Sequence, residues 1–494
     1  MTYMKSKRIF EDSGVVDPAR SYHVNLENVT NTQGQDMRTM VDWGRYFSIF
    51  APRQSGKTTF FRDFCFRLAE DPTYVPILLS FQFIAVKDFL TSMSVSTHTG
   101  IYDLFETLNQ LIQSKKIVVF IDEFDGIPRS ELENFLTTLR ELYQKYKGQT
   151  DKALYSVGLV GIRNITKLIV GGVSPFNIAD PVKLPPFSLK NVRDLYGQYT
   201  DETHQPFTEG AVLKIYEETA GQPWLVNRLG TLLTIDIKPE TTDPVSEKDV
   251  EKAVERLLYE ENNHFDNITE KARQFKETFV DVVFDGVNDV PGDEAQSLLL
   301  THGLIKAEGK KLTVANPIYR KRFAKTFFRE SHAATDVVDK GYYTPDGFLN
   351  MEAILSDFEE YIIQIGVNAF YAGGKPYEKT GQFLLTAWLY QFVEGGKGDL
   401  RYEVPSGLGR MDILLTYGGQ KTIIETKINR TLIHKTIDKA VDQVCDKYLL
   451  TERANEGYVI VFDVKKRVGE IEGPHSREKD GHKVLVFDMG IGRG

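Results

Sequence analysis

The segment that most constrains the fold is YFSIFAPRQSGKTTFFRDF, which begins at Tyr46. An apolar run over 46–51 leads into APRQSGKT, and apolar residues at helical spacing follow, so the segment predicts a buried strand, a loop and a helix. Residues 51–58 match the pattern G-x-x-x-x-G-K-[ST], except that Ala51 replaces the first glycine. In this context the loop N–H groups and the helix N-terminus predict a phosphate-binding site.

The same loop predicts a site for ATP and Mg²⁺. Lys57 is expected to neutralise the β- and γ-phosphates, and the Thr58 hydroxyl to ligate Mg²⁺. Backbone N–H groups of the loop should wrap the phosphates, at Arg53, Gln54, Ser55, Gly56 and Thr59. The apolar run IVVFIDEFD ends in Asp122 and Glu123. Asp122 is expected to hold the Mg²⁺ hydration shell, and Glu123 to orient or deprotonate the attacking water.

The order of the predicted elements indicates several domains in the 494 residues. Apolar strands at YFSIFA, VPILLSF, KIVVFIDEF and LYSVGLVGI alternate with helices, including those expected over 86–114 and 130–147. This alternation predicts a parallel sheet covered on both faces. Beyond Pro185-Pro186 the pattern is helical, and VSEKDVEKAVERLLYEENNHF is expected to form one helix. Two short strands around EGKK with a closing helix predict a winged-helix unit.

The segment GRMDILLTYGGQKTIIETKI predicts a β-hairpin, because two β-branched strands flank Gly418-Gly419. A turn centred on these glycines places Asp412 directly opposite Glu425. Like charges in opposed positions are unfavourable unless a cation lies between them. Lys427 shares a strand face with Glu425. Two carboxylates and a lysine at one point predict a Mg²⁺ site, where the metal polarises a scissile phosphate and Lys427 positions the attacking water.

The N-terminal motifs resemble the AAA-like family of prokaryotic ATPases, which is related to AAA+ and STAND proteins. The likeness spans roughly 46–233 and rests on YFSIFAPRQSGKTT, FIDEFD, VGLVGIRN, SPFNIADPVKLPPFSLKNVRDLY and AGQPWLVNRL. It implies that Arg163 responds to phosphate and that Pro223 belongs to a lid motif near the nucleotide base. From the residues alone, Arg163 is equally a surface cation and Pro223 a helix start. Both interpretations stay open for the neighbours of Pro223 as well: Gln222, Trp224 and Asn227.

The C-terminal segment resembles the core of PD-(D/E)XK nucleases, here Asp412 followed by Glu425-Thr426-Lys427. That resemblance implies two further catalytic residues, Glu378 at the start of EKTGQFLLTAWLYQF and Gln443 on the helix after the hairpin. Met411 stands where the literal motif has proline. The alternative is an ordinary surface hairpin with a ladder of charges. His434 is expected on an exposed helix face.

The predicted fold class is therefore multidomain α/β: a P-loop NTPase with a parallel sheet, a helical lid and a winged helix, then an α/β restriction-endonuclease-like domain. The predicted parts are an irregular N-terminal lead-in, the ATPase core, the lid, the winged-helix region, a linker and the nuclease-like domain. Their expected ranges are 1–40, 41–186, 187–240, 241–330, 331–348 and 349–494.

Composition and charge limit the expected binding partners and the cellular location of the chain. The net charge of −9 provides no overall basic field for nucleic acid. The chain lacks a run of about 18 apolar residues and an apolar secretory leader, so we expect a cytoplasmic protein without a membrane partner. The two cysteines, Cys65 and Cys445, are expected to be free thiols.

The leading hypothesis is an ATP-regulated, Mg²⁺-dependent nucleic-acid phosphodiesterase, with DNA the favoured substrate and defence against foreign DNA the suggested setting. Resemblance to STAND regulators also implies a homo-oligomer. The alternative is an ATP-dependent, STAND-like switch or scaffold that binds nucleic acid or partners without cutting. A processive DNA motor is a third hypothesis, which the single P-loop disfavours.

Overall fold

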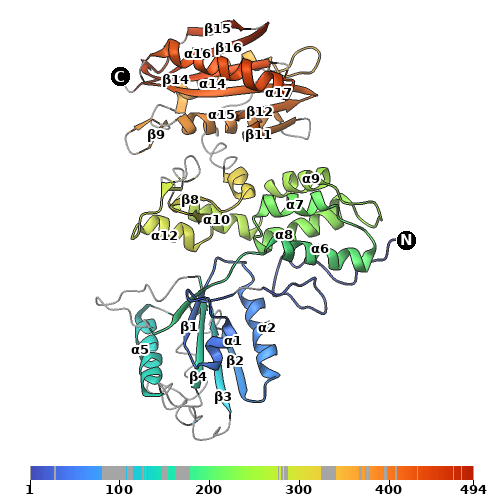
Figure 1. Ribbon diagram of the computed structural model, residues 1–494, viewed down its shortest axis with the longest axis vertical. Helices are drawn as coiled ribbons and strands as arrows, with labels where there is room; N and C mark the ends of the chain where they lie inside the picture. Colours follow the sequence, from blue (N-terminus) through green and yellow to red (C-terminus); the bar gives the residue numbers. More distant parts are fainter. Residues whose placement is uncertain are drawn as a thin grey trace. The chain divides into compact units, whose positions relative to one another are not determined.

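The computed structural model divides the chain into two compact units (Figure 1). The first comprises Met1–Phe279 and Asn288–Tyr319, and the second Val280–Val287 and Arg320–Gly494. The structure describes all residues except 1, 27–28, 81–106, 108–114, 125–126, 128, 147–153, 163–177, 276–277, 280–281, 283–286, 324–340, 366–369, 373–374, 377, 394–397, 407–408, 431, 455, 471, 480 and 493–494.

A five-stranded parallel sheet forms the centre of the first unit, in the order β2-β3-β4-β1-β5. Its strands are β1 (Phe47–Phe50), β2 (Tyr74–Ser80), β3 (Lys116–Asp122), β4 (Leu154–Gly161) and β5 (Asp180–Lys183). The four predicted strands are confirmed, whereas β5 was not anticipated. Because β4 lies between β1 and β3, the strand before the phosphate loop and the strand that ends in Asp122 are not neighbours.

Helices cover both faces of this sheet, as predicted. Helices α1 (Met37–Asp42) and α2 (Lys57–Ala69) lie on one side and α5 (Arg129–Tyr146) on the other (Figure 1). Alternate residues of β3 show the division, since Phe120 packs with α2 while Val119 and Ile121 pack with α5. The helix expected over 86–114 falls outside the described residues, apart from Thr107.

A group of helices follows the sheet in the first unit. These are α6 (Leu189–Thr203), α7 (Glu209–Thr219), α8 (Pro223–Thr231), the π-helix η3 (Leu232–Ile237), α9 (Glu247–Leu258) and α10 (Asn263–Gln274). The single helix predicted for VSEKDVEKAVERLLYEENNHF is wrong, because the chain breaks it into α9 and α10. The Asn262 side chain accepts a hydrogen bond from the Phe265 N–H and starts the new helix there.

The first unit ends with the predicted pair of short strands and the first three residues of a helix. Strands β7 (Ile305–Glu308) and β8 (Lys311–Val314) pair as an antiparallel hairpin, and a helix over 317–323 follows. The short strand β6 (Val287–Asn288) and helix α12 (Glu294–Thr301) precede them.

The second unit is built on a six-stranded mixed sheet in the order β11-β12-β13-β14-β16-β15. Its strands are β11 (Gly398–Ser406), β12 (Gly409–Tyr417), β13 (Gln420–Asn429), β14 (Glu456–Arg467), β15 (Glu472–Lys479) and β16 (His482–Gly492). The predicted order helix–strand–strand–helix–strand missed β11, β15 and β16. Strands β11 and β15 form the two edges of the sheet, and β15 has the polar sequence EGPHSREK, so it carries no apolar run to reveal it.

An apolar layer packs against each face of this sheet. Helices α14 (Met351–Ile365) and α15 (Glu378–Val393) cover one face, and α16 (Ile433–Gln443) with the π-helix η5 (Val444–Leu449) covers the other. The remaining elements are β9 (Tyr371–Ala372), β10 (Lys375–Pro376) and α17 (Leu450–Glu452). Within the described residues of both units, no helix has the length and apolar character required to cross a bilayer.

Candidate functional site

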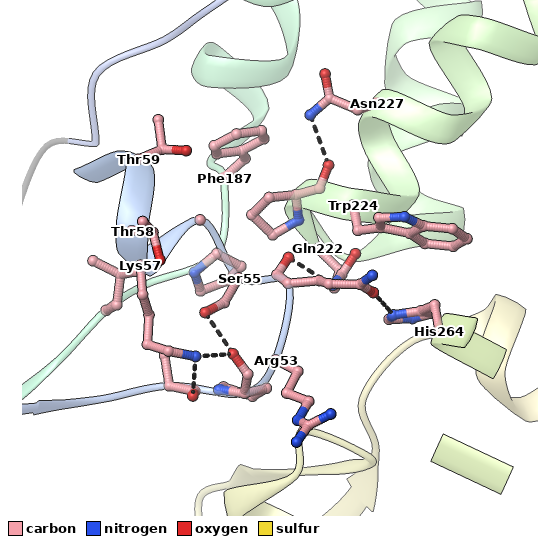
Figure 2. Close-up of a pocket in the computed structure, with 18 of the residues that line it drawn as sticks. Arg53, Ser55, Lys57, Thr58, Thr59, Phe187, Gln222, Trp224, Asn227 and His264 are labelled. Atoms are coloured by element: carbon pink, nitrogen blue, oxygen red, sulfur yellow. Dashed lines mark hydrogen bonds between the residues drawn. The ribbon is translucent and has the colours of Figure 1, made fainter. Parts of the chain in front are cut away.

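The phosphate loop connects β1 to α2, and the side chain of Lys57 folds back to the start of the loop. Gly56, at the helix N-cap, has φ 80°, and Gln54 has φ 56°. Lys57 Nζ donates to the carbonyl oxygens of Ala51 and Pro52 at 2.8 and 2.6 Å, as Figure 2 shows. These bonds close the loop around the ammonium group. The loop is therefore already folded around its principal positive charge.

A hydroxyl and a carboxylate meet beside this loop. The Thr58 Oγ1 donates to Asp122 Oδ2 over 2.7 Å, and Asp122 is 3% exposed at the end of β3. The next residue, Glu123, has φ 54° and donates its backbone N–H to Asp122 Oδ1 at 2.9 Å. Oxygen donors of these two types are the ligands that Mg²⁺ prefers. The Thr58–Asp122 pair thus fits a metal bound next to a phosphate.

A cavity of about 1910 Å³ lies over the loop. Every predicted nucleotide-site residue that the structure describes lines it: Arg53, Gln54, Ser55, Gly56, Lys57, Thr58, Thr59, Asp122, Glu123 and Pro223. Arg163 lies outside the described residues. Its neighbours Gly161 and Ile162, at the end of β4, line the same cavity.

The start of helix α8 lines this cavity (Figure 2). Gln222 caps the helix by accepting from the Leu225 N–H, and its Nε2 donates to the Gln54 carbonyl at 3.3 Å. The Asn227 Nδ2 donates to the Pro223 carbonyl within the helix, at 2.9 Å. Gln222 therefore links the start of α8 to the phosphate loop, whereas the side-chain amide of Asn227 bonds within its own helix.

The N-terminal segment, expected to be an irregular lead-in, also lines the cavity through residues 11–16. Trp224 Nε1 donates to the Asp12 carbonyl at 2.6 Å, and the Val16 N–H donates to Thr59 Oγ1 at 3.3 Å. His23 Nε2 lies 2.6 Å from Asp63 Oδ2 on α2. Sequence reasoning missed this wall because the segment has no apolar periodicity.

In the second unit, the β12–β13 hairpin turns at Gly418 and Gly419, with φ 56° and 86°. Its paired residues run from Tyr417↔Gln420 to Ile413↔Ile424, which is the predicted register. Both glycines are left-handed, as a two-residue turn that follows the strand twist requires. The turn geometry therefore brings Asp412 to the level of Glu425.

The carboxylate of Asp412 reaches past Glu425 and does not simply face it as predicted. Asp412 Oδ2 accepts from the backbone N–H and the hydroxyl of Thr426, at 2.7 and 2.8 Å. Lys427 Nζ lies 2.6 Å from Glu425 Oε1 and 3.9 Å from Asp412 Oδ2. The ammonium group of Lys427 therefore offsets the repulsion between the two carboxylates, as the shared strand face implies.

Glu425 is the most deeply buried member of this cluster, at 1% exposure. Burial, and then the charge of Asp412, raises its pKa to about 7, while Lys427 acts in the opposite direction. Its Oε2 is buried and accepts no hydrogen bond from any described residue. A buried carboxylate oxygen without a donor is unfavourable, and a divalent cation would satisfy it.

Two residues implied by the nuclease resemblance lie on the neighbouring helices. Helix α15 begins at Glu378, whose side chain lies outside the described set, and α16 ends at Gln443, whose Oε1 is buried without a described partner. Sequence reasoning missed Gln382, which donates to the Asp412 carbonyl at 3.2 Å. It also missed Tyr448, whose pKa is raised by burial and then by Glu425 and Asp412.

The described side chains hold no cluster of three or more histidine, cysteine, aspartate or glutamate residues suited to a metal. Asp412 and Glu425 thus stand as a pair of candidate ligands. His434 is exposed, as expected. Both cysteines are free thiols; Cys445 is buried and Cys65 is partly buried.

Comparison with known proteins gives matches to both parts of the chain. Residues 92–325 match the family model described as an AAA-like domain. Residues 349–466 match a family described as a domain of unknown function. No curated protein matches the sequence.

Several solved structures are similar to this chain. A Walker-type ATPase of Pyrococcus abyssi has 16% identity and a TM-score of 0.41, covering 60% of this chain and 98% of its own. The RuvB Holliday junction branch migration motor of Thermotoga maritima has 14% identity and a TM-score of 0.33, covering 61% and 92%. The ORC2 protein of Aeropyrum pernix has 14% identity and a TM-score of 0.35, covering 59% and 89%. The parallel sheet and the phosphate loop give the first unit the architecture of a P-loop NTPase, and the match over 92–325 supports an AAA-like ATPase in this part of the chain.

Proposed function

We propose that the first unit binds and hydrolyses ATP with Mg²⁺. The observation that carries this proposal is the convergence of Lys57 with the Thr58–Asp122 pair on one cavity. Lys57 would hold the β- and γ-phosphates, and Thr58 and Asp122 would hold the metal, directly and through water. Glu123 would orient the attacking water. Arg163 and Pro223 are proposed to respond to the phosphate and to border the base.

We further propose that the second unit is a Mg²⁺-dependent phosphodiesterase of the PD-(D/E)XK type that cuts nucleic acid, DNA being the favoured substrate. The carrying observation is the cluster of Asp412, Glu425 and Lys427, with Glu425 Oε2 buried and accepting from no described donor. These donors fit one divalent cation held by two carboxylates. Bound there, the metal would polarise the scissile phosphate and acidify its water.

Other residues around the cluster would have separate roles in cleavage. Thr426 holds one oxygen of Asp412 through two hydrogen bonds, which leaves the other available to a ligand. Lys427 would leave Glu425 when a cation arrives and would then position the attacking water beside the phosphate. Glu378 and Gln443 are proposed to complete the metal and water contacts from their helices.

ATP binding in the first unit is proposed to control cleavage in the second, within a homo-oligomer that acts against foreign DNA. The competing function is a STAND-like switch or scaffold that binds nucleic acid without cutting it. One observation favours it: Lys427 already pairs with Glu425 at 2.6 Å, so part of the negative charge of the cluster is offset without a metal.

Cleavage assays separate the two functions. Plasmid and single-stranded DNA are incubated with Mg²⁺ and either ATP, no nucleotide or a non-hydrolysable analogue. We expect Mg²⁺-dependent cutting, at least about 100-fold slower in Lys427→Ala because water positioning is lost. Lys421→Ala, on the same strand face near the turn, is the matched control and should cut normally.

Two further variants test metal binding by the second unit and the ATP dependence of cleavage. Glu425→Gln should weaken Mn²⁺ binding in a calorimetric titration, and Lys57→Ala should remove the ATP dependence of cutting. If Lys427→Ala cuts DNA as fast as the parent, the nuclease assignment fails. If the parent binds Mn²⁺ and DNA but does not cut, the scaffold function is favoured.

A further inference from the structure

The break between α9 and α10 places a histidine against the phosphate loop. His264 is the second residue of α10, is 5% exposed and lines the cavity described above. Figure 2 shows its ring beside Trp224 and directed toward the loop. The Asn262 cap sets where this helix starts and therefore where His264 lies.

Both ring nitrogens of His264 are engaged. Nδ1 bonds to Gln54 Oε1 in the phosphate loop, and Nε2 lies 2.8 Å from the Tyr319 hydroxyl in the helix after β8. The ring stacks on Trp224 of the lid, with centroids 4.2 Å apart and planes 18° apart. Burial lowers the pKa of His264 to about 3, so the ring is neutral, donating to Gln54 and accepting from Tyr319.

Gln54 itself has a conformation that needs support. Its φ of 56° is left-handed, which costs a non-glycine residue roughly 1–2 kcal/mol. Its carbonyl accepts from Gln222 and its side chain from His264, so it is held from two directions. The turn after α12 also packs on the loop, because a Cβ added at Gly303 would lie 2.5 Å from Pro52 Cγ.

We propose that His264 is a positioning residue for the phosphate loop, which fixes Gln54 and couples nucleotide binding to the docking of residues 263–275 and 288–319 on the parallel sheet of the first unit. The proposal rests on the ATP-binding function proposed above. Coupling of this kind is reciprocal. A nucleotide that needs the ordered loop strengthens the docking of α10, and a docked α10 strengthens nucleotide binding.

The test uses the full chain and His264→Phe, which keeps a ring on Trp224 and removes both hydrogen bonds. The matched control is Glu270→Ala, an exposed residue of the same helix. Without nucleotide, hydrogen exchange at amides 53–57 should be faster in His264→Phe than in the control. The Kd for Mg²⁺-ATP should rise about five- to tenfold, which is the range expected for one or two lost hydrogen bonds.

A double-mutant cycle isolates the contact. Gln54→Ala and the double variant Gln54→Ala/His264→Phe should have similar Kd values, because the second change removes an interaction already lost. In the parent, Mg²⁺-ATP should slow hydrogen exchange across 263–274. If His264→Phe does not fold, Tyr319→Phe removes one of the two bonds by deleting a single oxygen and should shift both readouts in the same direction.

The outcomes separate this proposal from the ATP-binding function. If exchange at 53–57 and the Kd both match the Glu270→Ala control, or if the two single effects multiply in the double variant, the positioning role is wrong. If the parent does not bind Mg²⁺-ATP, the ATP function fails, and loop exchange alone then decides the role of His264.

Discussion

Single charged residues in the first unit tie distant segments together. Arg228 of α8 bridges Asp12 and Glu260, at 2.9 and 2.7 Å. Arg45, before β1, pairs with Asp180 of β5. Because the paired positions are 32 to 216 apart in the sequence, these contacts order the N-terminal segment and the sheet edge around the phosphate loop. The pairs are partly buried, so salt screens them less than surface pairs.

The buried carboxyl of Glu359 in the second unit should make the folding stability depend on pH. Glu359 of α14 is 7% exposed, and burial raises its pKa to about 7, with Lys466 lowering and Asp488 raising it. The folded state then keeps its proton to a higher pH than the unfolded state. Stability should therefore fall as the pH rises from about 4.5 to about 7, and level off above that.

The glutamine of Glu359→Gln stays uncharged at every pH, so this variant should not show the fall in stability that the ionisation of Glu359 causes. Relative to the variant, the parent should lose up to about 3 kcal/mol of unfolding free energy between pH 4.5 and 8. Urea unfolding at four pH values measures the difference, with the exposed residue of the same helix, Glu352→Gln, as the control. Parallel pH profiles for the parent and Glu359→Gln would contradict the prediction.

At the level of elements, two turns decide where the candidate residues lie. The Asn262 cap starts α10 and brings His264 to the loop. The Gly418-Gly419 turn sets the register that brings Asp412 near Glu425. Small changes in the turns should therefore affect the sites as well as stability.

Gly419→Ala tests this for the hairpin. No atom lies within 4 Å of a Cβ added at Gly419, so the cost comes from the left-handed φ of 86°. We expect a loss of about 1–2 kcal/mol and weaker Mn²⁺ binding, measured by thermal unfolding and calorimetry. Gly473→Ala is the control, since its Cβ also meets open space and its φ lies outside the left-handed region. Equal melting temperatures for the two variants would refute the strain argument.

At the scale of the whole molecule, each unit has its own apolar core. Separate cores allow separate unfolding transitions. A ligand stabilises the part that binds it, by about 2.7 kcal/mol at a concentration 100 times its Kd.

Scanning calorimetry of the full chain should therefore show a transition that Mg²⁺-ATP raises and another that it leaves in place. Lys57→Ala should abolish the shift. A single transition that moves as a whole with nucleotide would show instead that the two units unfold together.

Local sequence determined the phosphate loop, the strand ending in Asp122, and the hairpin register around Gly418-Gly419. Each depends on residues within about ten positions of one another, where periodicity and turn chemistry decide the backbone. The structure accordingly confirms these elements. It also brings together all the described residues predicted for the nucleotide site.

Tertiary structure alone decided the rest. The cavity wall formed by 11–16, the Gln54–His264–Tyr319 chain and the contact of Gln382 with Asp412 join segments 30 to 210 residues apart. The edge strand β15 and the break before α10 likewise lack a clear apolar period. Hydrogen bonds and buried contacts between distant segments produce no hydrophobic periodicity in the sequence of either segment. Only the folded structure therefore shows which residues are in contact.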